Sequence, residues 1–281
     1  LLIPPSTTLI VYSLISGGTS IAALFLAGYL PGILMGLSLM LVVGILSKKR
    51  GYPVAPRPSA SQALVALRDA ILPLGLIVII MGGIVGGVFT ATEASAIAVV
   101  YALVLALVWY REIRVRDLPK LLVHSAVTTS IVLLMIGCSI AMSRAMAFGG
   151  IPGTISSFLL GLTDNPYMIL FVIVVILLVI GTFMDMTPAL LIFTPIFLPV
   201  VRDIGIDPVH FGIIMTINLC VGICTPPVGS ALFVGCSISG VSIAKVLRPL
   251  LPFYAVLIAV VLLVTFVTEI SLFLPRLLLG Y

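Results

Sequence analysis

The chain has 281 residues, of which 62% are hydrophobic and 8% are charged, and its formal net charge is +5. Water-soluble proteins carry about a quarter charged residues. Nine acidic and fourteen basic side chains do not cover a water-facing surface of this length, which excludes a soluble enzyme, a nucleic-acid-binding protein and a disordered scaffold. The composition predicts an all-α protein that crosses a lipid bilayer several times.

The first elements along the chain are one short and one long apolar stretch. Pro4–Ser16 is too short to cross a bilayer, which takes about 20 apolar residues. Ile21–Ser47 is long enough, and the basic run that follows it, Lys48-Lys49-Arg50, indicates the cytoplasmic side. Ala60–Leu72 then predicts an amphipathic helix that lies along the membrane surface.

The remaining uninterrupted apolar stretches each have the length of a single spanning helix. In chain order they are Leu74–Phe89, Glu93–Tyr110, Val123–Phe148 and, near the C-terminal end, Leu250–Leu274.

Two further apolar stretches are interrupted. Met168–Val201 is too long for one crossing and contains Gly181, Asp185 and three prolines. Val209–Ile238 is interrupted by the segment Thr225-Pro226-Pro227-Val228-Gly229. Irregular backbone at membrane depth is tolerated only where it is buried in protein or lines an aqueous cavity. A re-entrant hairpin and a broken helix are therefore predicted, the elements that form binding sites in secondary transporters.

The basic residues test this topology. With Met168–Val201 as a re-entrant hairpin that enters and leaves on the same side, eleven of the fourteen Lys and Arg residues fall on the cytoplasmic face. With Met168–Val201 as one full crossing, Lys245 and Arg248 fall on the opposite face. The charge pattern favours the hairpin.

A partial internal repeat supports the same architecture. Pro4-Pro5 is followed, fifteen residues after Pro5, by Ser20-Ile21-Ala22, and Pro226-Pro227 is followed at the same spacing by Ser242-Ile243-Ala244. The topology gives the two copies opposite orientations, as in the inverted repeats of alternating-access carriers. We expect the first copy to be incomplete here, beginning at the break of a helix whose first half is absent.

Asp185 is the main candidate for chemistry in the hairpin. A carboxylate inside the membrane costs several kcal/mol unless it is paired, so a role in binding substrate or ion is one reading. The other reading is a cap on the backbone N–H groups of the following helix. Thr187 and Asn218 are further candidates for contact with substrate, although Asn218 is equally compatible with an interhelical hydrogen bond.

The double proline predicts an ion site, because two prolines leave carbonyls of the preceding helical turn without donors. Such oxygens suit sodium, and the alternative is a proline kink that serves packing alone. No other metal or cofactor is expected: the four cysteines lie in apolar stretches, and no nucleophile–histidine–acid set indicates an enzyme. The helix-break residues are Pro4, Pro5, Pro226, Pro227 and Gly229.

Several motifs together resemble the large membrane (M) subunit of tripartite ATP-independent periplasmic (TRAP) transporters over essentially the whole chain. They are Ile3-Pro4-Pro5-Ser6, the run from Phe25 to Gly32, the run from Gly87 to Ala94, the run from Gly205 to Gly212, and Thr225-Pro226-Pro227-Val228-Gly229.

The resemblance implies an elevator-type fold with an inverted repeat, in the bacterial inner membrane. It implies sodium-driven import of an organic acid, such as sialic acid or a C4-dicarboxylate, together with a small membrane (Q) subunit and a periplasmic substrate-binding (P) protein. It also suggests a sodium site at Gly181, Gly222, Thr225 and Val228, with Asp185 close to the substrate. The alternatives are a stand-alone sodium/dicarboxylate symporter and, from another class, a membrane assembly subunit without transport activity.

The family pattern divides the chain into six parts and implies that the N-terminal repeat is missing. The parts are the end of the first transport repeat (1–20), a spanning helix (21–50), a cytoplasmic amphipathic arm (51–73), scaffold helices (74–165), the hairpin and broken helix of the transport domain (166–240), and a C-terminal spanning helix (241–281).

Overall fold

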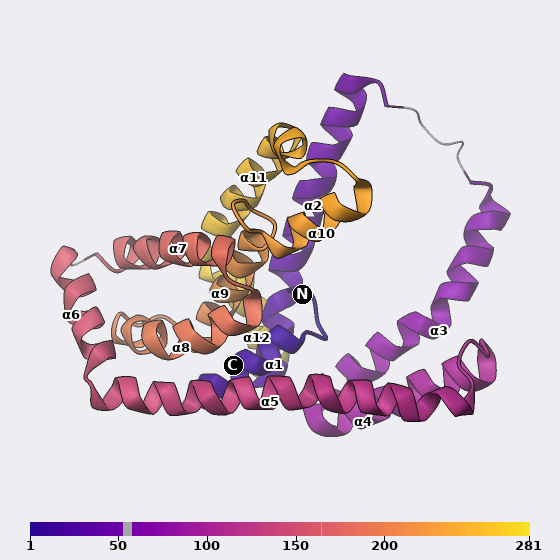
Figure 1. The fold of residues 1–281 in the computed structure, drawn as a ribbon, viewed down its shortest axis with the longest axis horizontal. Helices are drawn as coiled ribbons and strands as arrows, with labels where there is room; N and C mark the ends of the chain where they lie inside the picture. The colour runs from indigo at the N-terminus through magenta and orange to yellow at the C-terminus, as the bar shows by residue number, and fades with distance from the viewer. Residues whose placement is uncertain (53–57, 164) are drawn as a thin grey trace. The chain divides into compact units, whose positions relative to one another are not determined.

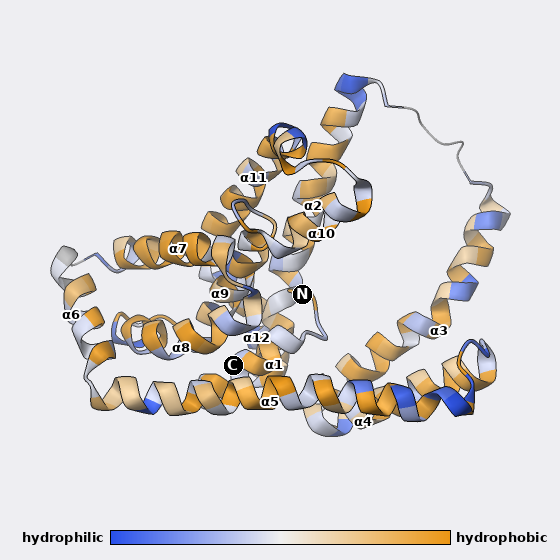
Figure 2. Cartoon of the chain, in the orientation of Figure 1, coloured by the Kyte–Doolittle hydropathy of each residue, from blue (hydrophilic) through white to orange (hydrophobic). Residues whose placement is uncertain are grey.

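The fold is all-helical, as predicted. A computed structural model describes residues 1–52, 58–163 and 165–281, and these contain helices and connecting turns without any strand (Figure 1). Within those ranges, seven helices are long and apolar enough to cross a membrane, and hydrophobic residues dominate along them (Figure 2). Residues 53–57 of the predicted arm, Arg57 among them, and residue 164 lie outside the described residues.

The helices follow one another with short connections. Their bounds are α1 Thr7–Ile15, α2 Ile21–Arg50, α3 Ala60–Val85, α4 Ala91–Val104 with a π-helical turn at Leu105–Trp109, a 3-10 turn at Val115–Asp117, α5 Leu118–Phe148, α6 Ile151–Leu162, α7 Pro166–Phe183, α8 Met186–Asp203, α9 Pro208–Gly222, α10 Ser230–Ser239, α11 Ile243–Phe266 and α12 Thr268–Leu279.

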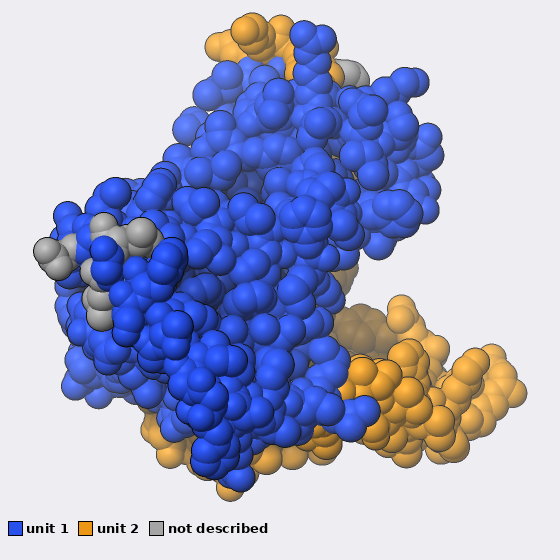
Figure 3. Space-filling view, turned by 60° about the vertical axis from the view of Figure 1, so that its left-hand side comes forward, with its two compact units in different colours: residues 1–46, 134–281 blue, residues 47–133 orange. Residues whose placement is uncertain are grey.

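The chain divides into two compact units (Figure 3). One unit contains residues 1–46 and 134–281, and the other contains residues 47–133. The hairpin and the broken helix predicted from the sequence both belong to the first unit, so that the candidate site lies within this unit alone.

Two helix boundaries differ from the sequence prediction. The amphipathic stretch Ala60–Leu72 and the span after it form one continuous helix, α3, with Pro73 inside it; a capping box of Ser59 and Gln62 starts this helix. The predicted span Leu250–Leu274 divides at Val267, whose φ of −107° and ψ of 83° leave the helical region. Val267 is itself apolar, so the hydropathy pattern continues through it and does not predict that the helix ends there.

Helix α9 is the centre of the first unit. Every residue from Val209 to Leu219 is buried, and α1, α7, α8, α11 and α12 pack around this helix. A helix that is apolar on all sides is stable only when enclosed in this way. Its start is fixed by Pro208 in the first turn and by Asp207, whose Oδ1 accepts from the Val209 N–H at 2.7 Å and the His210 N–H at 3.3 Å.

Each double proline precedes a short helix and then a long one. After Pro4-Pro5 come α1 and α2, and after Pro226-Pro227 come α10 and α11. Both Pro–Pro peptide bonds are cis. The long helices begin at Ile21 and Ile243, at the Ser-Ile-Ala positions of the sequence repeat. The order of elements matches the predicted repeat, while its inverted orientation in a membrane stays a prediction.

Helix α1 is attached firmly to α8 and α9. The Tyr12 hydroxyl donates to the Pro208 carbonyl at 2.6 Å, and Arg202 donates to the Ser16 carbonyl at 3.1 Å. Gly212 of α9 lies directly under the Tyr12 ring, so that a Cβ there would be 2.5 Å from Cε1 of Tyr12 and 2.9 Å from Cδ2 of Leu24. The first double proline and its helix therefore belong to the same packed body as the hairpin.

This packing predicts that Gly212→Ala destabilises the protein, because the added methyl group overlaps the Tyr12 ring. Overpacking of this kind costs about 1–3 kcal/mol, and a lower melting temperature in detergent is the measurement. Gly36→Ala is the matched control, since Gly36 is also helical and nothing lies within 4 Å of the position of its Cβ. Equal melting temperatures for the two variants would contradict the assigned contact.

Candidate functional site

The predicted hairpin is present as α7 and α8, which meet at a tip formed by Met184 and Asp185. Both tip residues have extended backbone, with φ and ψ of −116° and 146° at Met184 and −69° and 157° at Asp185. The Asp185 carbonyl accepts the first hydrogen bond of α8, from the Ala189 N–H at 3.1 Å. Each helix has 18 residues. How deeply the hairpin enters a membrane stays a prediction.

Helix α7 crosses α9 at two glycines, Gly181 and Gly222, three residues before the hairpin tip begins. A Cβ on Gly222 would lie 2.5 Å from both the Cα and the carbonyl carbon of Gly181, and a Cβ on Gly181 would lie 3.0 Å from the Cα of Gly222. The backbones of α7 and α9 therefore touch at this point, and no side chain fits between them. Two of the predicted sodium ligands are thus brought together.

The break, residues Thr225–Gly229 between α9 and α10, is hydrogen-bonded to the end of α7 through one carbonyl. The backbone N–H groups of Val228 and Gly229 both donate to the Thr182 carbonyl, each at 3.2 Å. Gly229 has a φ of +42°, and a Cβ there would lie 2.7 Å from the Thr225 carbonyl oxygen. Glycine is required at this position on both counts.

The four predicted sodium ligands differ in what their carbonyl oxygens already accept. The Gly222 carbonyl accepts the Thr225 N–H at 2.8 Å. Among the described residues, no backbone N–H donates to the carbonyls of Gly181, Thr225 or Val228. The Thr225 hydroxyl donates to the Val221 carbonyl at 2.7 Å, which leaves its own lone pairs available. Three carbonyls and one hydroxyl oxygen at the break and the tip can therefore accept a cation.

Asp185 is exposed and occupies the N-cap position of α8, but its side chain makes no hydrogen bond to the backbone of that helix. The capping alternative is therefore absent from this structure. Instead the Ser230 hydroxyl, at the first residue of α10, donates to Oδ1 of Asp185 at 3.4 Å. The N-terminal ends of α8 and α10 thus come together, and helix N-termini attract anions.

The two other predicted substrate residues lie in different surroundings. Thr187 is half-buried in the first turn of α8. Asn218 is fully buried in α9, where Nδ2 donates to the Ile214 carbonyl of its own helix at 2.7 Å. The interhelical hydrogen bond considered for Asn218 is not present in the described part of the chain, and its Oδ1 has no partner there. Contact of either residue with substrate stays a prediction.

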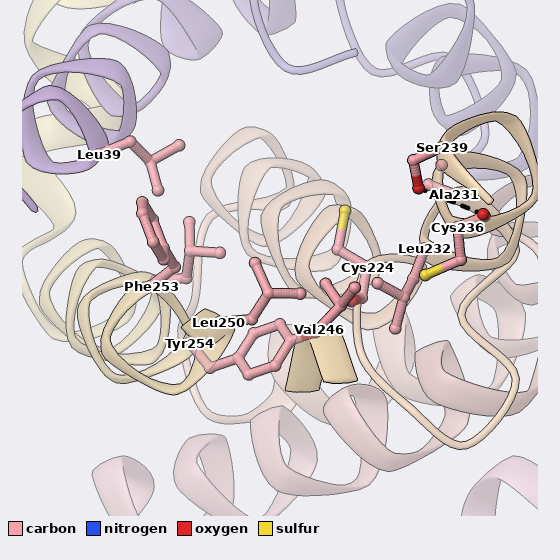
Figure 4. A pocket seen from close by; sticks show the side chains of 12 residues that line it. Leu39, Cys224, Ala231, Leu232, Cys236, Ser239, Val246, Leu250, Phe253 and Tyr254 are labelled. Atoms are coloured by element: carbon pink, nitrogen blue, oxygen red, sulfur yellow. Dashed lines mark hydrogen bonds between the residues drawn. The ribbon is translucent and has the colours of Figure 1, made fainter. Parts of the chain in front are cut away.

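Sequence reasoning missed three residues that build the site: Thr182, Ser230 and Tyr254. The Tyr254 hydroxyl of α11 donates to the Cys224 carbonyl at 2.8 Å and so holds the break from the other side. Tyr254 and Cys224 both line an apolar pocket of about 410 Å³ between α2, α10 and α11 (Figure 4). None of the three carried a signal in the sequence, and Ser230 follows the N-cap of α10, which is Gly229, rather than occupying it.

The crossing predicts that Gly222→Ala separates the break from the hairpin tip, because the new methyl group overlaps backbone that cannot rotate away. The Val228 and Gly229 amides should then exchange their hydrogens about tenfold faster, as loss of a hydrogen bond worth about 1.4 kcal/mol requires. Hydrogen exchange of the peptide that spans the break measures this. Gly235→Ala, on α10 with no atom within 4 Å of its Cβ position, is the control and should leave the exchange unchanged.

Comparison with known proteins gives the family of the chain. Residues 1–270 match the DctM component of the tripartite ATP-independent periplasmic transporters. The chain is 57% identical to the uncharacterized protein YgiK of Salmonella typhimurium, over 99% of this chain and 63% of that protein. It is 39% identical to the C4-dicarboxylate TRAP transporter large permease protein DctM of Pseudomonas aeruginosa, over 98% and 64% of the two chains.

A third relative is the sialic acid TRAP transporter large permease protein SiaM of Vibrio cholerae, 39% identical over all of this chain and 65% of that protein. The chain thus spans less than two thirds of the length of each of these relatives. The family consists of transport permeases rather than enzymes. Together with the apolar helices, this makes the chain a multi-pass protein of the inner membrane, and it belongs to the DctM family of TRAP transporter large permeases.

Proposed function

We propose that this chain forms the ion-binding part of a sodium-coupled importer that moves a small organic acid across the inner membrane by an elevator mechanism. One observation carries the proposal: the hairpin tip and the broken helix meet backbone to backbone at Gly181 and Gly222, beside carbonyls that accept no backbone N–H group. A packing kink alone does not need two glycines at a helix crossing together with unused acceptors on both elements.

The oxygens at the crossing and in the break are of the kind that sodium prefers, which supports the proposal. Small hard cations take carbonyl and hydroxyl oxygens as ligands, and the C-terminal end of α9 adds the partial negative charge of its helix dipole. The carbonyls of Gly181, Thr225 and Val228 and the Thr225 hydroxyl are proposed as ligands. The Gly222 carbonyl already accepts one hydrogen bond and serves through its second lone pair.

An anionic substrate fits the other side of the tip. The N-terminal ends of α8 and α10 meet where Ser230 contacts Asp185, and their backbone N–H groups favour a carboxylate. The relatives are named for a C4-dicarboxylate, sialic acid and 2,3-diketo-L-gulonate, which are all organic acids. We propose a substrate of this class, delivered by a periplasmic binding protein and moved together with a small membrane subunit.

The negative charge of Asp185 couples the binding of sodium to the binding of the substrate. A substrate carboxylate that enters beside Asp185 meets a like charge, and bound sodium offsets this repulsion. Sodium then raises the affinity for the substrate, and by linkage the substrate raises the affinity for sodium by the same factor. The dense packing of α1, α7 and α8 around α9 supports movement of these helices as one body, as an elevator requires.

The sodium assignment predicts that Thr225→Ala weakens the dependence of transport on sodium, because one oxygen ligand is removed. In proteoliposomes that contain the full-length permease, the small subunit and the binding protein, the sodium concentration for half-maximal uptake should rise about tenfold. Thr154→Ala is the matched control, since its hydroxyl makes the same kind of bond to its own helix, to Gly150 at 3.1 Å.

Unchanged sodium dependence in Thr225→Ala would contradict the assignment of Thr225 as a sodium ligand. Uptake that proceeds without any binding protein would instead favour the stand-alone sodium/dicarboxylate symporter. An absence of sodium-driven uptake, together with no thermal stabilisation by sodium and an organic acid, would favour a membrane assembly subunit.

The negative charge of Asp185 predicts a separate effect of the substitution Asp185→Asn. Removal of the like charge should strengthen substrate binding in sodium-free buffer and reduce the gain that sodium gives, by about tenfold. Equilibrium binding with and without sodium measures both. Asp203→Asn makes the same change at the other end of α8 and should leave the gain intact. An unchanged gain in Asp185→Asn would show that Asp185 takes no part in coupling.

A further inference from the structure

The net positive charge of the chain belongs to the second unit. Residues 47–133 contain nine Lys and Arg residues and four Asp and Glu residues, whereas residues 1–46 and 134–281 contain five of each. The second unit therefore has a net charge of +5, which is that of the whole chain, and the first unit is neutral. A body with this excess of one sign attracts anions.

The connection between α4 and α5 has the densest group of charges in this unit, and Figure 2 shows the hydrophilic stretch at the start of α5. Four basic residues lie within ten positions: Arg111, Arg114, Arg116 and Lys120. All four are exposed, and none forms an ion pair in the described part of the chain. The same stretch contains two carboxylates, Glu112 and Asp117, which leave an excess of two positive charges. The Asp117 carboxylate already accepts the backbone N–H of Arg114 at 3.1 Å.

Aromatic side chains and helix length put this connection among the lipid headgroups. The π-helical turn after α4 ends at Trp109, the single tryptophan of the chain, and Tyr110 follows. The two residues are 67% and 44% exposed, and Trp and Tyr favour the interface between membrane and water. Helix α5 has 31 residues and a length of about 46 Å, which exceeds the hydrocarbon core of about 30 Å. Its first turns therefore extend beyond that core.

A groove on the surface of α5 begins next to the basic residues. It has a volume of about 450 Å³ and is lined by Leu121, His124, Ser125, Thr128 and Thr129. These positions lie three and four residues apart and so share one face of the helix. Lys120 precedes His124 by one turn. The imidazole and the hydroxyl groups can donate hydrogen bonds to phosphate oxygens, and Leu121 offers an apolar contact to an acyl chain.

We propose that the α4–α5 connection and this groove bind an anionic phospholipid. The basic side chains attract its phosphate, as polybasic segments beside a spanning helix do, and the headgroup occupies the groove on α5. The connection is ordered before the lipid binds, because the N–H groups of Glu112 and Ile113 both donate to the Ala106 carbonyl, at 3.0 and 3.4 Å. Little ordering is then left for the lipid to impose. All of these residues belong to the second unit, so the proposal stands independently of sodium coupling.

Native mass spectrometry of the full-length permease in detergent tests the preference for the headgroup. Phosphatidylglycerol is compared with phosphatidylcholine of the same acyl chains, whose phosphate is neutralised by a positive choline group. Phosphatidylglycerol should bind about tenfold more tightly, and Arg116→Gln/Lys120→Gln should remove this preference, because two attractions near the membrane surface are lost. The matched control is Lys245→Gln/Arg248→Gln, which removes two exposed basic residues from the first unit and should leave the preference intact.

Fluorescence of Trp109 locates the bound lipid. The permease is placed in nanodiscs that contain brominated phosphatidylglycerol or brominated phosphatidylcholine, since bromine quenches a nearby indole. The spectrum of Trp109→Phe is subtracted, which removes the signal of any other tryptophan in the full-length protein. Brominated phosphatidylglycerol should quench Trp109 more strongly, and the difference between the two lipids should disappear in Arg116→Gln/Lys120→Gln. Unchanged melting temperatures confirm that the variants fold.

Four outcomes would overturn the proposal. They are equal affinity for the two lipids in the unmodified permease, a preference that survives in Arg116→Gln/Lys120→Gln, an equal loss of preference in the control pair, and equal quenching of Trp109 by the two brominated lipids. Displacement of phosphatidylglycerol by inorganic phosphate would also overturn it, because the connection would then bind a free anion rather than a lipid.

Discussion

The contact between Gly181 and Gly222 is the constraint on which the rest of the site depends. Because the two backbones touch, the Thr182 carbonyl comes within reach of the Val228 and Gly229 amides, and the break is held against the hairpin tip. A side chain at either glycine would separate these groups. The hairpin tip, with the exposed Asp185, and the break are therefore held together as one unit. Their close approach is possible because neither Gly181 nor Gly222 carries a side chain.

The polarity of the helices makes this crossing suitable for ions of both signs. Helix α9 ends here and presents the partial negative charge of its C-terminal end beside the carbonyls of Gly181, Thr225 and Val228, whereas α8 and α10 begin here and present backbone N–H groups. A continuous helix would bury all of these groups in its own hydrogen bonds. The break therefore places unused carbonyl acceptors and backbone N–H donors within a few residues of each other, without a strongly charged pocket inside an apolar protein.

The helices and the break between α9 and α10 can be predicted from the sequence for physical reasons. Length and hydropathy predict helices because the bilayer demands them, and Pro226-Pro227 predicts a break because prolines lack the N–H group that a helix needs. The contacts of Thr182, Ser230 and Tyr254 were not readable, because each joins residues 30 or more positions apart. Hydropathy also missed the end of α11 at Val267, since an apolar residue breaks a helix there without changing the pattern.

Two polar side chains of α9 lower the stability of the packed body. The helix is buried on all sides, yet it contains His210 and Asn218, each with one buried acceptor that no described residue satisfies. An unsatisfied buried acceptor costs about 1–3 kcal/mol, and an apolar side chain of similar size would avoid that cost. Stability alone therefore selects against both residues. Both residues lie on the helix whose C-terminal end carries the proposed sodium site, and Asn218 is about one turn from that end.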